Sequence, residues 1–230
     1  MTENHDSSTL YDLLSQCARS HGTPQDPEVF YPELGSSLSL FHECLLEAGL
    51  KREETLDRPH VCEGPEALQC AHLSQFIIAF LPFNSVTEKS EFNQVIFDLF
   101  SFFQWMDRNK IPHALNGVDL GSLLRDLSAM QERCLQLSHY LDDQSARTLK
   151  DPPELCRTVT DFFKVVSIEN GFLCLQGRRD KELMRLKLPE NILSLARIND
   201  QLDLTLGDTS ERWVMLEAGQ VFPKAPETQR

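Results

Sequence analysis

The chain has 230 residues, of which 41% are hydrophobic and 25% are charged. These are the proportions of an ordinary globular protein, and the length suits one large domain or two modest ones. The 35 acidic and 22 basic residues leave a formal net charge of -13, which argues against a protein that wraps duplex nucleic acid by neutralising its phosphates. No apolar run approaches the roughly 20 residues of a membrane-spanning helix, and the N-terminus is polar and acidic rather than signal-like. We therefore expect a cytoplasmic protein that does not bind membranes.

The first 150 residues carry the three- and four-residue spacing of apolar side chains that is typical of helices. Proline, glycine and clustered charges interrupt this spacing and predict loops over residues 23–35 and 51–64. Ser85 and Glu88 match a capping box at the start of one helix. Helices are predicted over residues 9–20, 37–48, 65–81, 85–111 and 119–141. Residues 1–150, with 22 acidic and 11 basic residues, are therefore expected to form an acidic, all-α bundle of about five helices.

The segment from Ser85 to Ile111 is predicted to be the central helix of this bundle. Four of the seven residues from Phe97 to Phe103 are phenylalanine. One helical face carries Phe92, Val95, Ile96, Leu99, Phe100, Phe103 and Met106, and it is widened by Phe97, Phe102 and Trp105. We therefore expect neighbouring elements to cover this helix on more than one side.

The pattern changes in the last third of the chain. Residues 143–153 are polar and end in Pro152-Pro153, which predicts a connection between two domains. Beyond it the apolar spacing drops to two, and Asn170-Gly171 is typical of a hairpin turn. Strands are predicted over residues 162–168, 172–175, 183–188, 202–206 and 212–216, with a short helix over 189–198. This order predicts an α+β protein in which residues 151–230 form a small five-stranded antiparallel β-barrel, OB-like or alternatively SH3-like.

Five basic residues gather within ten positions of the predicted barrel. They are Arg178, Arg179, Lys181, Arg185 and Lys187. A charged strand face beside aromatic side chains can bind single-stranded nucleic acid or another anion. Acidic residues interrupt the run, however, and alternating charges also mark the solvated face of any half-buried sheet. The cluster is therefore a candidate binding site for single-stranded nucleic acid or a protein, or a solvated surface, and we expect most of Phe162, Phe163, Phe172 and Trp213 in the core.

The cysteines and histidines do not form a recognisable metal-binding pattern. The seven cysteines, at positions 17, 44, 62, 70, 134, 156 and 174, are scattered singly, so we expect them to be reduced. His60-Val61-Cys62 and Cys70-Ala71-His72 contain residue types that suit zinc, but their spacing differs from the usual paired cysteines. Alternate helical residues such as Cys70 and His72 diverge by roughly 200°. His42 and Cys44 share this defect, so we predict packing or surface roles and no metal, with a metal-stabilised regulatory protein as a third hypothesis.

The helical half resembles one known family. Leu73–Leu81 follows the pattern L-x-x-F-x-x-x-F-L, and residues 98–111 read DLFSFFQWMDRNKI. Over about 40 residues this stretch is similar to the helical core-binding domain of the tyrosine recombinases. The catalytic domain of that family, with its arginines, histidine and tyrosine nucleophile, has no counterpart in this chain. The acidic charge of this half is also unlike a DNA clamp, so no residue role is carried over.

Familiar catalytic motifs are absent from the sequence. It contains no G-x-G-x-x-G, P-loop, H-E-x-x-H or G-x-S-x-G pattern. We therefore expect no catalytic residue and no cofactor. The leading hypothesis is a non-enzymatic binding or adaptor protein that acts through protein–protein contacts, with acidic charge steering the partner and apolar anchors supplying affinity. The alternative is a nucleic-acid-associated accessory protein that binds single strands through the basic hairpin.

Overall fold

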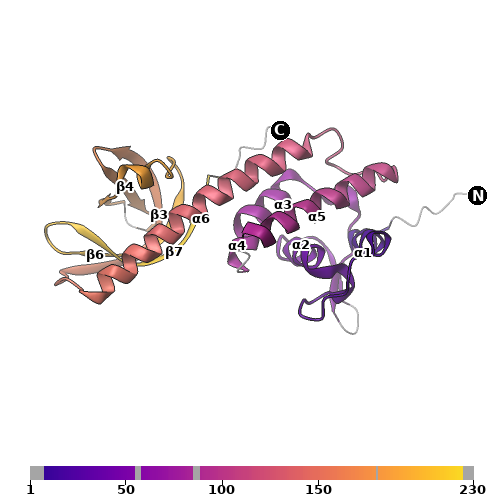
Figure 1. Ribbon diagram of the computed structural model, residues 1–230, viewed down its shortest axis with the longest axis horizontal. Helices are drawn as coiled ribbons and strands as arrows, with labels where there is room; N and C mark the ends of the chain where they lie inside the picture. Colours follow the sequence, from indigo (N-terminus) through magenta and orange to yellow (C-terminus); the bar gives the residue numbers. More distant parts are fainter. Residues whose placement is uncertain (1–7, 55–57, 85–88, 180, 225–230) are drawn as a thin grey trace, which may run out of the picture. The chain divides into compact units, whose positions relative to one another are not determined.

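The computed structural model describes residues 8–54, 58–84, 89–179 and 181–224. Within them the chain forms two compact units, of which unit 1 ends at Asp126 and unit 2 begins at Leu127 (Figure 1). Both units contain helices and strands, so the fold is α+β. None of the described helices is both long enough and apolar enough to cross a membrane.

Unit 1 combines helices with one small β-hairpin. Its α-helices are α1 (Leu10–His21), α2 (Gly35–Glu47), α3 (Cys70–Gln75), α4 (Leu81–Phe83), α5 (Lys89–Arg108) and the first part of α6 (Leu120–Lys150). Short 3₁₀ helices cover Pro32–Leu34 and Pro65–Ala67. The hairpin strands are β1 (Arg52–Glu54) and β2 (Pro59–Val61). The predicted helices at 9–20, 37–48 and 85–111 thus correspond to α1, α2 and α5, while the proposed capping box at 85–88 lies outside the described residues.

Local sequence sets both ends of α1. The Thr9 hydroxyl accepts a hydrogen bond from the Asp12 backbone N–H, and the Asp12 carboxylate accepts one from the Thr9 N–H, each 3.1 Å long. This reciprocal capping box satisfies donors that the first helical turn leaves open. Gly22 then ends the helix in the left-handed conformation, with φ of 64°, which costs glycine little because it has no Cβ.

The helix predicted over residues 65–81 is broken into pieces. A 3₁₀ turn occupies Pro65–Ala67, and α3 begins only at Cys70. A π-helical segment, η3 (Phe76–Phe80), then joins α3 to α4. Pro82 has no N–H to donate to the carbonyl four residues earlier, and the widened turns lie directly before it. The proline is therefore accommodated inside the helical run, which ends at Phe83, two residues later than predicted.

The N-terminal half is not the clear helical bundle that the sequence predicts. Residues 51–64, predicted to be a loop, contain β1 and β2, which pair antiparallel with Glu53 opposite His60. Strands of three residues give no detectable alternation, and the charged sequence Arg52-Glu53-Glu54 resembles a solvated loop. The prediction of an all-α N-terminal domain was wrong for this reason.

Unit 2 contains one five-stranded antiparallel sheet. Its strands are β3 (Arg157–Glu169), β4 (Phe172–Gly177), β5 (Leu183–Lys187), β6 (Gln201–Asp208) and β7 (Trp213–Phe222), and the short α7 (Glu190–Leu193) lies between β5 and β6. The spatial order is β5-β4-β3-β6-β7. Asn170 and Gly171 join β3 to β4 with φ of 53° and 79°, as expected for an Asn-Gly hairpin turn.

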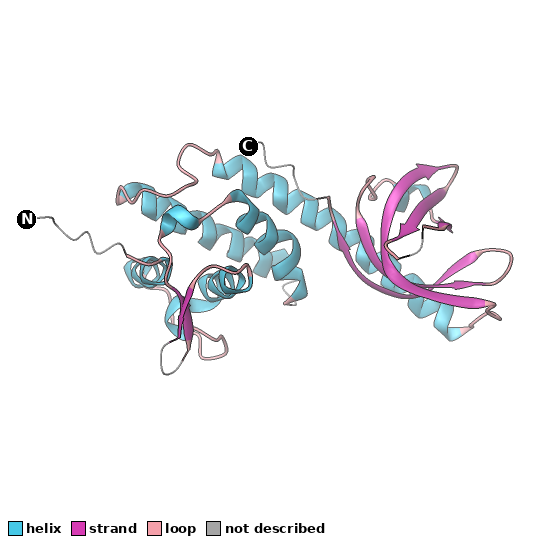
Figure 2. Ribbon diagram, turned by 180° about the vertical axis from the view of Figure 1, so that it is seen from behind, coloured by secondary structure: helices cyan, strands magenta, loops and turns pink. Residues whose placement is uncertain are grey.

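The sheet is open, so the prediction of an OB-like or SH3-like barrel was wrong. Strands β5 and β7 form the two edges and do not pair with each other. The inner face is instead completed by α6, from which Cys134, Leu137 and Leu141 join the buried core of the sheet. Figure 2 shows the curled strands with α6 against one face. Because a helix covers the apolar face, closure of the sheet is not needed to bury it.

Helix α6 occupies most of the residues that the sequence predicts to connect two domains. It continues without a break through residues 143–150 and ends at Lys150, shortly before the double proline. Ser145 is buried on it, and its hydroxyl donates to the Asp142 carbonyl over 2.8 Å. The polar composition of this stretch therefore reflects the exposed side of a helix rather than a loop.

Candidate functional site

The structure leaves all five predicted basic residues exposed. Arg178, Arg179 and Lys181 lie in the turn between β4 and β5, whereas Arg185 and Lys187 lie on β5. Alternate residues of a strand share a face, so Arg185 and Lys187 project together. The hairpin thus brings two of the five side chains onto one strand face and places the other three at its tip.

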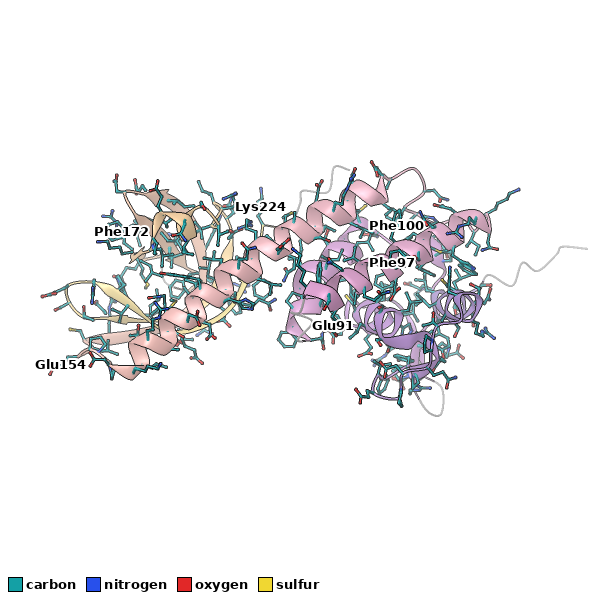
Figure 3. All side chains as sticks on the ribbon, in the orientation of Figure 1. Glu91, Phe97, Phe100, Glu154, Phe172 and Lys224 are labelled. Atoms are coloured by element: carbon teal, nitrogen blue, oxygen red, sulfur yellow. The ribbon has the colours of Figure 1, made fainter. Side chains whose placement is uncertain are left out.

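Contacts within unit 2 fix the position of this basic hairpin. The Asp161 carboxylate accepts a hydrogen bond of 2.8 Å from the Arg179 backbone N–H. The Arg185 guanidinium stacks over the Phe172 ring, 4.5 Å from its centroid, and Phe172 is labelled in Figure 3. Glu182, which interrupts the basic run, forms an ion pair with Arg157 at 2.5 Å.

The aromatic residues near the hairpin do not share one environment. Phe163 is fully buried in the sheet core, and Trp213 packs at its edge with the Arg157 guanidinium 4.9 Å above its ring. Phe162, by contrast, is 42% exposed on the opposite face of β3. The sequence predicts that most of the four aromatic rings near the hairpin lie in the core, but of the four only Phe163 is buried, and Phe172 and Trp213 are half-buried. Phe162 points away from the core because two neighbouring residues of a strand place their side chains on opposite faces.

A second candidate site is a groove of about 790 Å³ in unit 1. It is lined by α1, by the loop that follows it, by the start of α2 and by α5. The lining includes Cys17, His21, Asp26, Ser36, Ser37, Glu91, Gln94, Phe97 and Asp98. Gly35, with φ of 70°, lets α2 start against the loop, since a Cβ there would lie 2.5 Å from the Thr23 side chain. No motif or spacing in the sequence predicts this groove.

The described charged groups that line the groove are carboxylates. Asp26 accepts a hydrogen bond of 2.6 Å from the Ser36 hydroxyl, and Asp98 accepts one of 2.6 Å from the Ser37 hydroxyl. The Ser36 bond, followed by one from the Glu28 backbone, lowers the pKa of Asp26. Two adjacent serines in the first turn of α2 therefore hold two acidic side chains in place. Negative charge is also favoured at the N-terminus of a helix.

Phe97 provides an apolar surface in the same groove. It is 64% exposed, although the sequence predicts that α5 is covered on more than one side. Figure 3 labels Phe97 and Glu91 on α5. Other phenylalanines of this helix, such as Phe102 and Phe103, are fully buried as expected. Phe100 and Trp105 are half-buried, so Phe97 is the exposed ring among the described aromatic residues of α5.

The groove does not contain an activated cysteine. The Cys17 sulfur lies 3.4 Å from Nδ1 of His21, a distance that would suit a thiol–imidazole pair. Burial, and then the charge of Asp98, raises the pKa of the Cys17 thiol to about 12. The thiol is therefore protonated at neutral pH and is a poor nucleophile.

The histidine and cysteine pairs noted in the sequence have structural contacts. His72 Nδ1 accepts a 3.2 Å hydrogen bond from the Gln69 backbone N–H and so caps α3. The Cys62 thiol donates to the Lys51 carbonyl over 3.4 Å. His42 and Cys44 are both buried in unit 1. Across the described part of the chain, no three histidine, cysteine, aspartate or glutamate side chains are grouped so that they could hold a metal ion.

Comparison with protein-family models, characterised proteins and solved structures finds no match for this chain. The resemblance to the recombinase core-binding domain therefore gains no support. The functional assignment depends on the groove, the basic hairpin and the residues around them.

Proposed function

We propose that the protein is a binding module whose unit 1 captures a cationic, partly apolar segment of another protein in its groove. The observation that carries this proposal is the exposed Phe97 ring, which lines the same groove as the carboxylates of Glu91 and Asp98. Lysine and arginine side chains complement carboxylates, and an apolar neighbour in the partner segment would cover the ring. The sequence favours a protein-binding module, and the proposal adds a binding site in unit 1 and a positive charge on the partner segment.

The groove is prepared for such a ligand before it binds. Asp98 is held from two directions, by the Ser37 hydroxyl at 2.6 Å and by the Gln94 amide at 2.8 Å. A carboxylate has about four acceptor positions, so oxygen lone pairs remain for a cation. Because these side chains are already ordered, binding loses less conformational entropy than it would with mobile carboxylates. The charges increase the association rate and select the partner, while burial of the Phe97 ring contributes about 1.5–3 kcal/mol.

Site-specific photo-crosslinking in the full chain tests this proposal. A benzophenone amino acid at position 97 should capture a partner segment in native cell extract, and mass spectrometry should find that segment rich in lysine and arginine. Phe83 offers a matched control, because it is another phenylalanine of unit 1, it is 81% exposed, and it does not line the groove. Equal capture from positions 83 and 97, or capture of acidic segments, would contradict the proposal.

Two substitutions separate the apolar and the charged contributions. Phe97→Ala should weaken binding of the captured segment by at least about tenfold, because the ring no longer loses exposed surface. Asp98→Asn should slow association and reduce the dependence of binding on salt. Asp126→Asn is the matched control for charge, since Asp126 is exposed on α6 and is not part of the groove lining. An Asp126→Asn effect as large as that of Asp98→Asn would point to general charge rather than to the groove.

A further inference from the structure

The solvent face of the sheet in unit 2 carries a continuous row of side chains across all five strands. The strand pairing places Leu183 opposite Gln176, Gln176 opposite Lys164, Lys164 opposite Gln201 and Gln201 opposite Phe222. Directly opposed residues in a sheet project to the same side. This row, together with its neighbours on the same side of β3, β4 and β5, is called here the outer face.

Aromatic rings lie at two places on the outer face. Phe162, two residues before Lys164 on β3, lies beside Phe222 with 6.4 Å between ring centroids. Phe172 lies on β4 beneath the Arg185 guanidinium. Phe172 pairs with Glu169 on β3, so the two aromatic places are separated along the strand by roughly 20 Å at about 3.3 Å per residue.

Basic side chains occupy the space between and around these rings. Lys164, Arg185 and Lys187 are exposed on the strands, and Arg178, Arg179 and Lys181 are exposed at the hairpin tip. In the described part of the chain, the charged side-chain groups of these six residues form no ion pair of 4.0 Å or less with a carboxylate. Glu169 and Asp203 also lie on this side, opposite Phe172 and Phe162 respectively, so cations outnumber the acids beside the rings.

We propose that the outer face binds single-stranded nucleic acid along β3 and β4. Bases would stack on Phe162 and on the Arg185 guanidinium that covers Phe172, and the phosphates between them would contact Lys164 and the basic tip. Both requirements for single-strand binding are thereby met, namely π-faces for unpaired bases and a cationic track for the backbone. A duplex would not use the rings, because its bases are already stacked on one another. The two aromatic places are far enough apart for several nucleotides.

This inference is independent of the groove in unit 1. It assigns roles to Lys164 and Phe222, which the sequence pattern does not connect with the basic cluster, and it gives Phe162 a role as an exposed ring. Lys164 lies far from the hairpin tip in sequence, but strand pairing places it directly opposite Gln176.

Fluorescence anisotropy of the full chain with a labelled oligothymidylate of about 12 nucleotides tests the proposal. At low salt the unmodified protein should bind this single strand more tightly than a duplex of the same length. Phe162→Leu keeps an apolar contact with Phe222 but removes the ring, and it should weaken binding about fivefold to a hundredfold. Lys164→Gln should lower the slope of log affinity against log salt by about 0.7.

Arg212→Gln is the matched control, because Arg212 is an exposed arginine in the turn between β6 and β7. It should leave both affinity and salt slope unchanged. Circular dichroism establishes that each variant is folded, and Phe162→Tyr should retain binding because it retains the ring. Absence of binding at low salt overturns the proposal, as does equal affinity for duplex and single strand, or a Phe162→Leu variant that binds as well as the unmodified protein.

Discussion

The carboxylate of Asp161 and the backbone N–H of Arg179 form a 2.8 Å hydrogen bond that fastens the turn after β4 to strand β3. The other Asp161 oxygen accepts a 2.8 Å bond from the backbone N–H of Phe162. Only 8% of Asp161 is exposed, so water cannot easily replace either contact. One buried carboxylate therefore orders both the start of the basic tip and the residue that carries the exposed ring.

Asp161→Ala should destabilise unit 2 by about 1–3 kcal/mol, because it leaves backbone donors without their acceptor. Hydrogen exchange at the Arg179 amide should accelerate in this variant, and urea denaturation should show the loss of stability. Asp161→Asn retains an acceptor oxygen and should therefore lose less stability than Asp161→Ala. Glu211→Ala, which removes an exposed acid from another turn, should change neither measurement, and protection of the Arg179 amide that survives Asp161→Ala would contradict this account.

Arg133 and Asp200 form the most buried ion pair of unit 2 among its described residues, with contacts of 2.6 and 3.0 Å between the guanidinium and both carboxylate oxygens. Arg133→Met should destabilise the protein by about 3–5 kcal/mol, because it leaves a buried carboxylate without its partner. Asp200→Asn alone should also lower the free energy of unfolding. The double variant should lose less stability than the sum of the losses in the two single variants. Urea denaturation of all four proteins gives the coupling energy, and strictly additive losses would show that the pair does not interact.

In the hairpin turn between β3 and β4, the effect of backbone conformation on stability can be tested without disturbing side-chain packing. Gly171 has φ of 79°, and a Cβ added there would meet no atom within 4 Å. Gly171→Ala should therefore cost about 1–2 kcal/mol from its left-handed backbone conformation alone. Asn170→Gly should be close to neutral, since glycine adopts positive φ freely. Thermal unfolding of both variants checks this, and a neutral Gly171→Ala would mean that the turn changes conformation.

The sequence predicts most strands of unit 2 because their signal is local. Asn170-Gly171 defines a turn, and the alternation of Met184, Leu186 and Leu188 with charged residues defines the buried side of β5, as the structure confirms. Closure of the sheet is a different kind of property. It depends on whether the edge strands meet and on what covers the apolar face, and the Leu137 and Leu141 seam of α6 gives no sign of whether its partner is a helix or a sheet.

The groove could not be predicted from the sequence for a related reason, since it depends on contacts between distant segments. Asp26 and Asp98 are far apart in the chain, and only the fold brings both into the groove lining, where Ser36 binds Asp26 and Ser37 binds Asp98. Phe97 lies on a helix with phenylalanines on several sides, so periodicity does not indicate which ring stays exposed. The basic hairpin, by contrast, is continuous in sequence and was found, although Lys164 on the neighbouring strand was not.

His42 connects α2 to β2 through a buried hydrogen bond. Its Nε2 accepts a 3.1 Å bond from the Val61 backbone N–H, so the proton is on Nδ1, which has no hydrogen-bond partner among the described residues. Burial, followed by the charge of His60, lowers the pKa of His42 from 6.5 to about 4. The unfolded chain therefore binds a proton that the folded chain does not between these two pH values, and stability falls as the pH decreases through this range.

Acidification from pH 6.5 to about 4 should thus remove about 3 kcal/mol of stability through His42. Hydrogen exchange at the Val61 amide and urea denaturation across this range measure the effect. In His42→Gln the amide oxygen can still accept the Val61 bond but does not titrate, so the pH dependence should flatten relative to the unmodified protein. His139→Gln, at an exposed position on α6, should leave the profile unchanged. If His42→Gln keeps the full pH dependence, the acid sensitivity arises from other groups and His42 is not its source.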